Sequence, residues 1–150
     1  MSAKSPRFAA WLGTAAVIVH GIPLVLHSMA HVQLQIFLPS VLANIYIGVV
    51  LFAAPVVAAA LLWAGWIRGG GWLLVLSMLG SLVFEVYNHF VAMSPDHVSQ
   101  VPAGLWGEIF SVTAVASSIT EVLGIAAGVV ILIAARSSIS PRSTEAMAIE

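Results

Sequence analysis

The longest apolar stretch of the chain covers residues 105–135 and reads LWGEIFSVTAVASSITEVLGIAAGVVILIAA. Its only charged side chains are those of Glu108 and Glu121. A helix needs about 20 apolar residues to cross the hydrocarbon core of a bilayer, which is about 30 Å thick. This stretch therefore predicts a transmembrane helix with length to spare.

Three further stretches have the length and apolar character of membrane spans. They cover about residues 8–31, 41–66 and 72–93. We therefore expect an all-α integral membrane protein, a four-transmembrane-helix bundle that forms a single domain over residues 1–136. Residues 137–150 are polar and are expected to be a disordered tail.

The composition of the whole chain agrees with this fold class. Of its 150 residues, 61% are hydrophobic and 7% are charged, and the formal net charge is −1. A soluble domain has about 25% charged residues, so the expected partner is the lipid bilayer. No basic surface can form, so nucleic-acid binding is not expected. The chain has no cysteine, which excludes disulfides, thiolate-bound zinc and iron–sulfur clusters.

The basic side chains fall on alternate connections of this arrangement. They precede the first span, separate the second from the third, or follow the fourth: Lys4, Arg7, Arg68, Arg136 and Arg142. Connections rich in Lys and Arg stay in the cytoplasm, so we expect a multi-pass protein with both termini cytoplasmic. Arginine followed by three glycines predicts a tight turn at residues 68–71.

The first span admits a second interpretation, a cleavable signal peptide. Lys4 and Arg7, an apolar run and the small side chains of Ser28 and Ala30 have that pattern. The run is long for a signal peptide and includes His20 and Pro23. These features favour a helix that is retained.

Polar side chains recur on single faces of three spans. They are Ser77, Ser81, Glu85 and His89 on the third span, His20, His27 and His31 on the first, and Glu121 on the fourth. Spacings of three, four or seven residues place side chains on one helix face. Ionisable groups in hydrocarbon cost several kcal/mol, so these faces should converge on the bundle axis. At about 1.5 Å of rise per residue, His20, Glu85 and Glu121 should share a depth near the bilayer centre.

The leading functional hypothesis is a transition-metal ion or a haem in the outer half of the bundle. Imidazole and carboxylate ligands suit zinc, iron, copper or manganese. Four side chains are candidate metal ligands: His27, His31, Glu85 and His89. For a haem, the candidate axial ligands are His20 or His27 facing His89.

Other functional classes stay open. Glu85 and Glu121 could be the acid–base groups of a membrane enzyme, isomerase- or hydratase-like, that acts on an apolar, lipid-like substrate. A structural or assembly subunit would use the same groups only for hydrogen bonds between helices. A proton relay or cation carrier is less favoured, because four helices are few for alternating access.

Two further features concern packing and the outward connection. Gly124 and Gly128 predict close approach of the fourth helix to another helix, either within the chain or in a homodimer. In the connection 94–104, the sequence Ser-Pro-Asp-His predicts a capped turn. There, Asp96 could orient His97, or both residues could join the outer end of the site.

Overall fold

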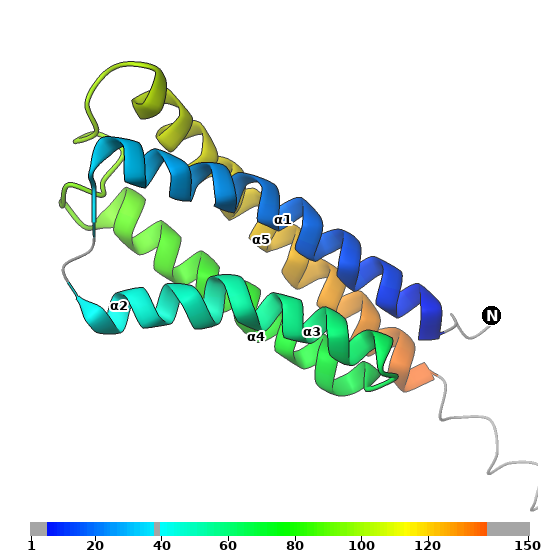
Figure 1. The fold of residues 1–150 in the computed structure, drawn as a ribbon. Helices are drawn as coiled ribbons and strands as arrows, with labels where there is room; N and C mark the ends of the chain where they lie inside the picture. The colour runs from blue at the N-terminus through cyan, green and yellow to red at the C-terminus, as the bar shows by residue number, and fades with distance from the viewer. Residues whose placement is uncertain (1–5, 38–39, 138–150) are drawn as a thin grey trace, which may run out of the picture.

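The computed structural model describes residues 6–37 and 40–137 (Figure 1). Within these ranges it is helical and has no strand. Its elements are α1 (Pro6–Leu34), α2 (Val41–Tyr46), the π-helical segment η1 (Ile47–Ala53), α3 (Ala54–Trp63), α4 (Ile67–Val86), the π-helical segment η2 (Tyr87–Val91) and α5 (Leu105–Ser137). The segments α2–η1–α3 and α4–η2 are each continuous, so four helices are long and apolar enough to cross a membrane. The predicted helical class and the four apolar helices are confirmed.

Successive long helices run in opposite directions (Figure 1). The start of α1, the turn between α3 and α4 and the end of α5 lie together at one end of the bundle. That end carries Arg7, Arg68 and Arg136, and we call it the basic end. The opposite end, which we call the outer end, carries the connections that follow α1 and η2. Lys4, Arg142 and the predicted tail beyond Ser137 lie outside the described residues.

The turn predicted at residues 68–71 is wrong. The chain reverses at residues 64–66, where Gly65 has a φ of 84°, and Arg68 is already inside α4. The following glycines serve packing instead. A Cβ at Gly70 would lie 2.9 Å from the Ala58 carbonyl oxygen, so only glycine allows α3 and α4 to approach this closely. Tertiary packing here overrides the turn preference of glycine.

Packing separates two halves of the bundle interior. Near the basic end, the buried core consists of apolar side chains: Ala9, Ala10, Ala58, Leu62, Leu74, Met78 and Ile131. Toward the opposite end, the buried side chains include the predicted polar faces. The exterior carries many large apolar side chains, such as Leu42, Val83 and Val112. The expected convergence of polar side chains on the interior is therefore confirmed.

The small-residue face of α5 packs against α4 of the same chain. A Cβ at Gly124 would lie 2.8 Å from Met78 Cγ, and one at Gly128 would lie 2.6 Å from Val75 Cγ2. This is the packing within the chain that the sequence allowed. A homodimer through the same two glycines would require α4 and α5 to separate first.

This contact predicts a large difference between two glycine substitutions. Gly128→Ala should destabilise the fold by about 1–3 kcal/mol, because the new methyl group meets Val75 and lies 3.2 Å from the Gly71 carbonyl oxygen. Gly21→Ala is the matched control, since a Cβ there meets nothing within 4 Å. It should stabilise the helix by up to about 1 kcal/mol. Denaturant unfolding in detergent measures both, and equal effects would contradict the packing.

Candidate metal centre

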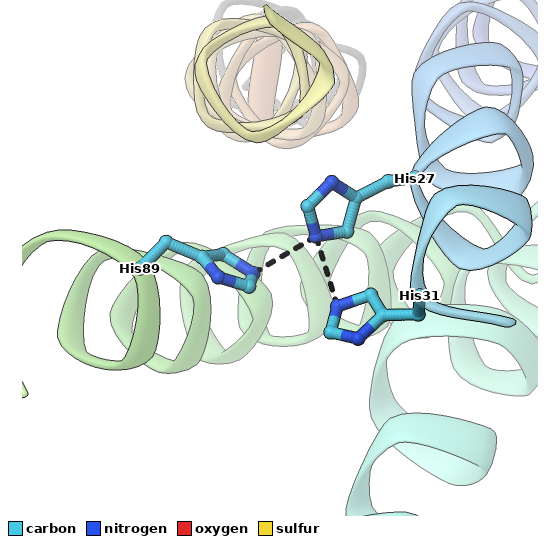
Figure 2. Close-up of side chains that lie close together, drawn as sticks. All are labelled: His27, His31 and His89. Atoms are coloured by element: carbon cyan, nitrogen blue, oxygen red, sulfur yellow. Dashed lines mark hydrogen bonds between the residues drawn. The ribbon is translucent and has the colours of Figure 1, made fainter. Parts of the chain in front are cut away.

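Three imidazole rings converge where α1 passes η2 (Figure 2). His27 and His31 lie one turn apart on α1, and His89 belongs to η2. The Nε2 atom of His27 lies 3.1 Å from His89 Nε2 and 3.1 Å from His31 Nε2. One ligand atom from each ring falls within 4.8 Å of the others, so the three residues could hold a metal ion.

The opposite nitrogen of each ring contacts a backbone carbonyl oxygen. These contacts join the Nδ1 atoms of His27, His31 and His89 to the oxygens of Phe110, Ile36 and Asp96 at 3.1, 3.0 and 2.9 Å. A carbonyl oxygen can only accept, so each Nδ1 must carry the hydrogen and donate it. A neutral imidazole has one N–H, so each Nε2 presents a lone pair.

Three lone pairs that face one another repel unless a cation lies between them. Two nitrogens bound to zinc at 2.0–2.1 Å with a tetrahedral angle lie about 3.3 Å apart, which is close to the 3.1 Å between His27 Nε2 and each of the other two Nε2 atoms. Metal-binding histidines in proteins almost always donate their second N–H to a carbonyl, a carboxylate or water. The Nε2 separations and the Nδ1 hydrogen bonds to backbone oxygens are therefore both of the kind seen at a metal centre.

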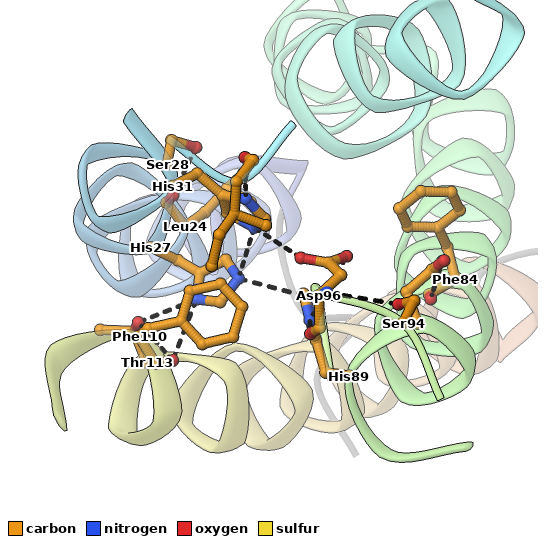
Figure 3. Close-up of polar contacts among 12 residues, drawn as sticks. Leu24, His27, Ser28, His31, Phe84, His89, Ser94, Asp96, Phe110 and Thr113 are labelled. Carbon is orange, nitrogen blue, oxygen red and sulfur yellow. Dashed lines mark hydrogen bonds and ion pairs between the residues drawn. The ribbon is translucent and has the colours of Figure 1, made fainter. Parts of the chain in front are cut away.

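Asp96 brings an oxygen to the same place (Figure 3). Its Oδ1 lies 3.3 Å from His31 Nε2, and its side chain is buried. Oδ1 has no hydrogen-bond partner among the described residues. Its other oxygen, Oδ2, lies 3.6 Å from His89 Nδ1. Asp96 therefore lies beside His31, but its oxygens do not belong to the group of ligand atoms that lie within 4.8 Å of one another. To become a fourth, negatively charged ligand, its side chain would have to turn toward the three nitrogens.

The loop that carries Asp96 is the predicted capped turn. The Asp96 N–H donates to Ser94 Oγ at 3.3 Å, and the Val98 N–H donates to the His89 carbonyl oxygen at 3.0 Å. His97 does not take part in the cluster. Its Nδ1 accepts from the Ser99 N–H at 3.1 Å. Of the two residues that the sequence offered for the outer end of the site, only Asp96 reaches it.

Helix α5 orients the central ring. His27 Nδ1 also lies 3.0 Å from Thr113 Oγ1, and the Thr113 hydroxyl donates to the Ile109 carbonyl oxygen at 2.6 Å. Thr113 and Phe110 thus fix His27 from a third helix. No sequence pattern marks these two residues, because Phe110 contributes only a backbone oxygen and Thr113 resembles any threonine of an apolar helix.

A cavity of about 200 Å³ lies beside the imidazoles. One part of its wall is polar and includes the three histidines, Asp96 and Glu85. The remainder is mainly apolar and comes from α1, from α2 with η1, and from α4, with residues such as Leu24, Leu51 and Phe84. A small molecule in this cavity could touch both the metal ligands and a carboxyl group.

The other predicted site residues lie deeper in the bundle. His20, Glu85 and Glu121 are all buried, but none belongs to the group of converging ligand atoms. Glu85 lines the cavity, whereas Glu121 does not. His20 Nδ1 lies 3.4 Å from Thr120 Oγ1. The structure thus brings together three of the four candidate metal ligands and leaves Glu85 beside them.

Comparison with protein-family models, with curated proteins and with solved structures finds no match to this chain.

Proposed function

We propose that this chain is a multi-pass membrane protein that binds a transition-metal ion through His27, His31 and His89, with Asp96 as a fourth ligand. One observation carries the proposal: three buried or half-buried imidazoles each donate Nδ1–H to a backbone oxygen and turn their Nε2 lone pairs toward one point. Such an arrangement is unfavourable without a cation and favourable with one.

The ligand set indicates which ions fit. Three nitrogens and one carboxylate oxygen suit Zn²⁺, and they also suit Fe²⁺ or Co²⁺. A haem fits less well. Axial nitrogens on opposite sides of one iron stand about 4 Å apart, twice a metal–nitrogen bond of about 2 Å, with the porphyrin between them. The nitrogens of His27 and His89 are 3.1 Å apart.

Membrane insertion is supported by the four long apolar helices and by their apolar exterior. The proposed orientation follows from the basic end, which carries every described Lys or Arg side chain. By the positive-inside rule that end faces the cytoplasm. The metal centre then lies near the opposite, outer face of the membrane.

Titration with Co²⁺ tests the metal centre directly. Purified protein in detergent should bind Co²⁺ and develop the visible absorption bands of a tetrahedral nitrogen–oxygen site. Added Zn²⁺ should displace Co²⁺ and remove these bands. A protein that stays colourless and retains neither ion after dialysis would rule out the proposal.

Asp96→Asn tests the fourth ligand. The amide keeps the size of the side chain but loses its charge, so Co²⁺ and Zn²⁺ affinity should fall at least about 10-fold. The visible spectrum should also change, because one ligand is altered. Glu108→Gln is the matched control, since it removes one carboxylate from an exposed position on α5. Equal affinities in the two variants would exclude Asp96 as a ligand.

A further inference from the structure

Five polar side chains form a second buried group, on the basic-end side of the three histidines. They are His20, Ser81, Glu85, Ser117 and Glu121, each 1% exposed or less. Every one has an atom without a hydrogen-bond partner among the described residues: His20 Nε2, Ser81 Oγ, Glu85 Oε2, Ser117 Oγ and both carboxylate oxygens of Glu121. Buried polar groups in folded proteins are paired in the large majority of cases. Five unpaired neighbours therefore point to a bound partner.

The register of α4 against α5 places four of these side chains together. Met78 contacts Gly124, and the two helices run antiparallel (Figure 1). Counting the same number of residues forward along α4 from Met78 and backward along α5 from Gly124 therefore reaches residues at the same level. From this register we expect Ser81 to face Glu121 and, one turn further out, Glu85 to face Ser117.

His20 approaches the same level from α1. Its Nδ1 lies 3.4 Å from Thr120 Oγ1, and the Thr120 hydroxyl donates to the Ser117 carbonyl oxygen at 2.9 Å. The hydroxyl proton is thus used, so Thr120 accepts from His20 Nδ1–H. The ring of His20 also interacts with the backbone of Leu51. The group offers the oxygens of two carboxylates and two hydroxyls, and His20 lies beside them, because the ligand atoms of His20, Glu85 and Glu121 do not all fall within 4.8 Å of one another.

We propose that this group is a second cation site, which takes a divalent ion that prefers oxygen ligands, such as Mn²⁺. Glu85 and Glu121 would bind the ion, and their two negative charges would balance it in a low-dielectric interior. Carboxylate and hydroxyl oxygens suit Mn²⁺ better than they suit Cu²⁺. The site shares no ligand with the three histidines, although Glu85 lines the same cavity.

The surroundings give this site one polar approach. Toward the basic end, the apolar side chains of Leu62, Leu74, Met78 and Ile131 close the interior. Toward the outer end, Glu85 lines the cavity beside the three histidines. A cation would therefore reach Glu121 from the outer end, through that cavity and past Glu85.

Electron paramagnetic resonance of Mn²⁺ tests the second site in the full chain, in detergent, after Zn²⁺ has been added to saturate the three histidines. Wild-type protein should bind one Mn²⁺ per chain. Glu121→Gln should lower that affinity at least about 10-fold and leave Zn²⁺ binding intact, which also shows that the variant is folded. Glu108→Gln, which removes an exposed carboxylate, should bind both ions normally.

Several outcomes would decide against the proposal. Equal Mn²⁺ binding by wild type and Glu121→Gln would overturn it, as would no Mn²⁺ binding by folded wild type. If Glu121→Gln also lost Zn²⁺, the milder Ser81→Ala would decide, because it removes a neutral oxygen only: weaker Mn²⁺ binding supports the site and unchanged binding overturns it. His89→Ala separates the two proposals, since it should lose Zn²⁺ but keep Mn²⁺.

Discussion

Replacing His89 with alanine should lower the affinity for Zn²⁺ by more than about 100-fold. The substitution removes one of the three converging nitrogens and leaves two. Loss of a residue that merely orients a ligand already costs about 10–100-fold in affinity, so loss of a ligand should cost more. Equilibrium dialysis of purified protein against buffered Zn²⁺ measures the change.

His97→Ala is the matched control for this experiment. His97 lies on the same loop as Asp96, but its ring contacts Ser99 and does not reach the cluster. That variant should bind Zn²⁺ as tightly as wild type. If both alanine variants lost Zn²⁺ equally, or if neither did, the three converging imidazoles would not be the metal site.

Cysteine labelling should give an all-or-none result for membrane topology. The natural chain has no cysteine, so single introduced thiols are clean probes. In intact cells, a membrane-impermeant maleimide should label Gln100→Cys, which lies in the outer loop. It should label Ser137→Cys, at the end of α5, only after the cells are opened. Both positions are exposed in the fold, so protection must come from the membrane.

A third position tests insertion itself. Val83 lies within α4 and is 62% exposed on the apolar exterior. In a bilayer, Val83→Cys should resist the water-soluble maleimide even in opened cells, and it should react once the protein is unfolded in detergent. Ready labelling in opened cells would show that this face meets water and would refute the proposed span. The reverse pattern at Gln100 and Ser137 would invert the orientation.

Long apolar runs made the helices predictable, but their ends were less so. The stretch 105–135 is long and apolar enough to predict one long helix, and α5 indeed spans Leu105–Ser137. The start of α4 was placed too late, because three glycines in sequence resemble a turn. Their function depends on a partner that is remote in the chain. Gly71 meets Leu132 of α5, and no local pattern reveals such a contact.

The candidate site was predictable where it depends on helix periodicity. His27 and His31 are four residues apart, and His89 belongs to the polar stripe of the third span, so all three were expected ligands. Glu85 was grouped with His89 because ordinary α-helical spacing was assumed. The wider π-helical turn of η2 begins between them, and such turns often occur at functional sites. Asp96 depends on the conformation of a loop, which periodicity does not determine.

The apolar core at the basic end is also an electrical insulator. In a bilayer, a voltage falls mainly across the region that contains neither water nor polar groups, and a full crossing is worth about 2.3 kcal/mol per charge at 100 mV. Here that region is the layer formed by Leu62, Leu74, Met78 and Ile131. Ions that enter from the outer face would stop before this layer. An ion bound by the three histidines would therefore cross little of the membrane voltage, whereas an ion at Glu121, nearer the bilayer centre, would cross more of it.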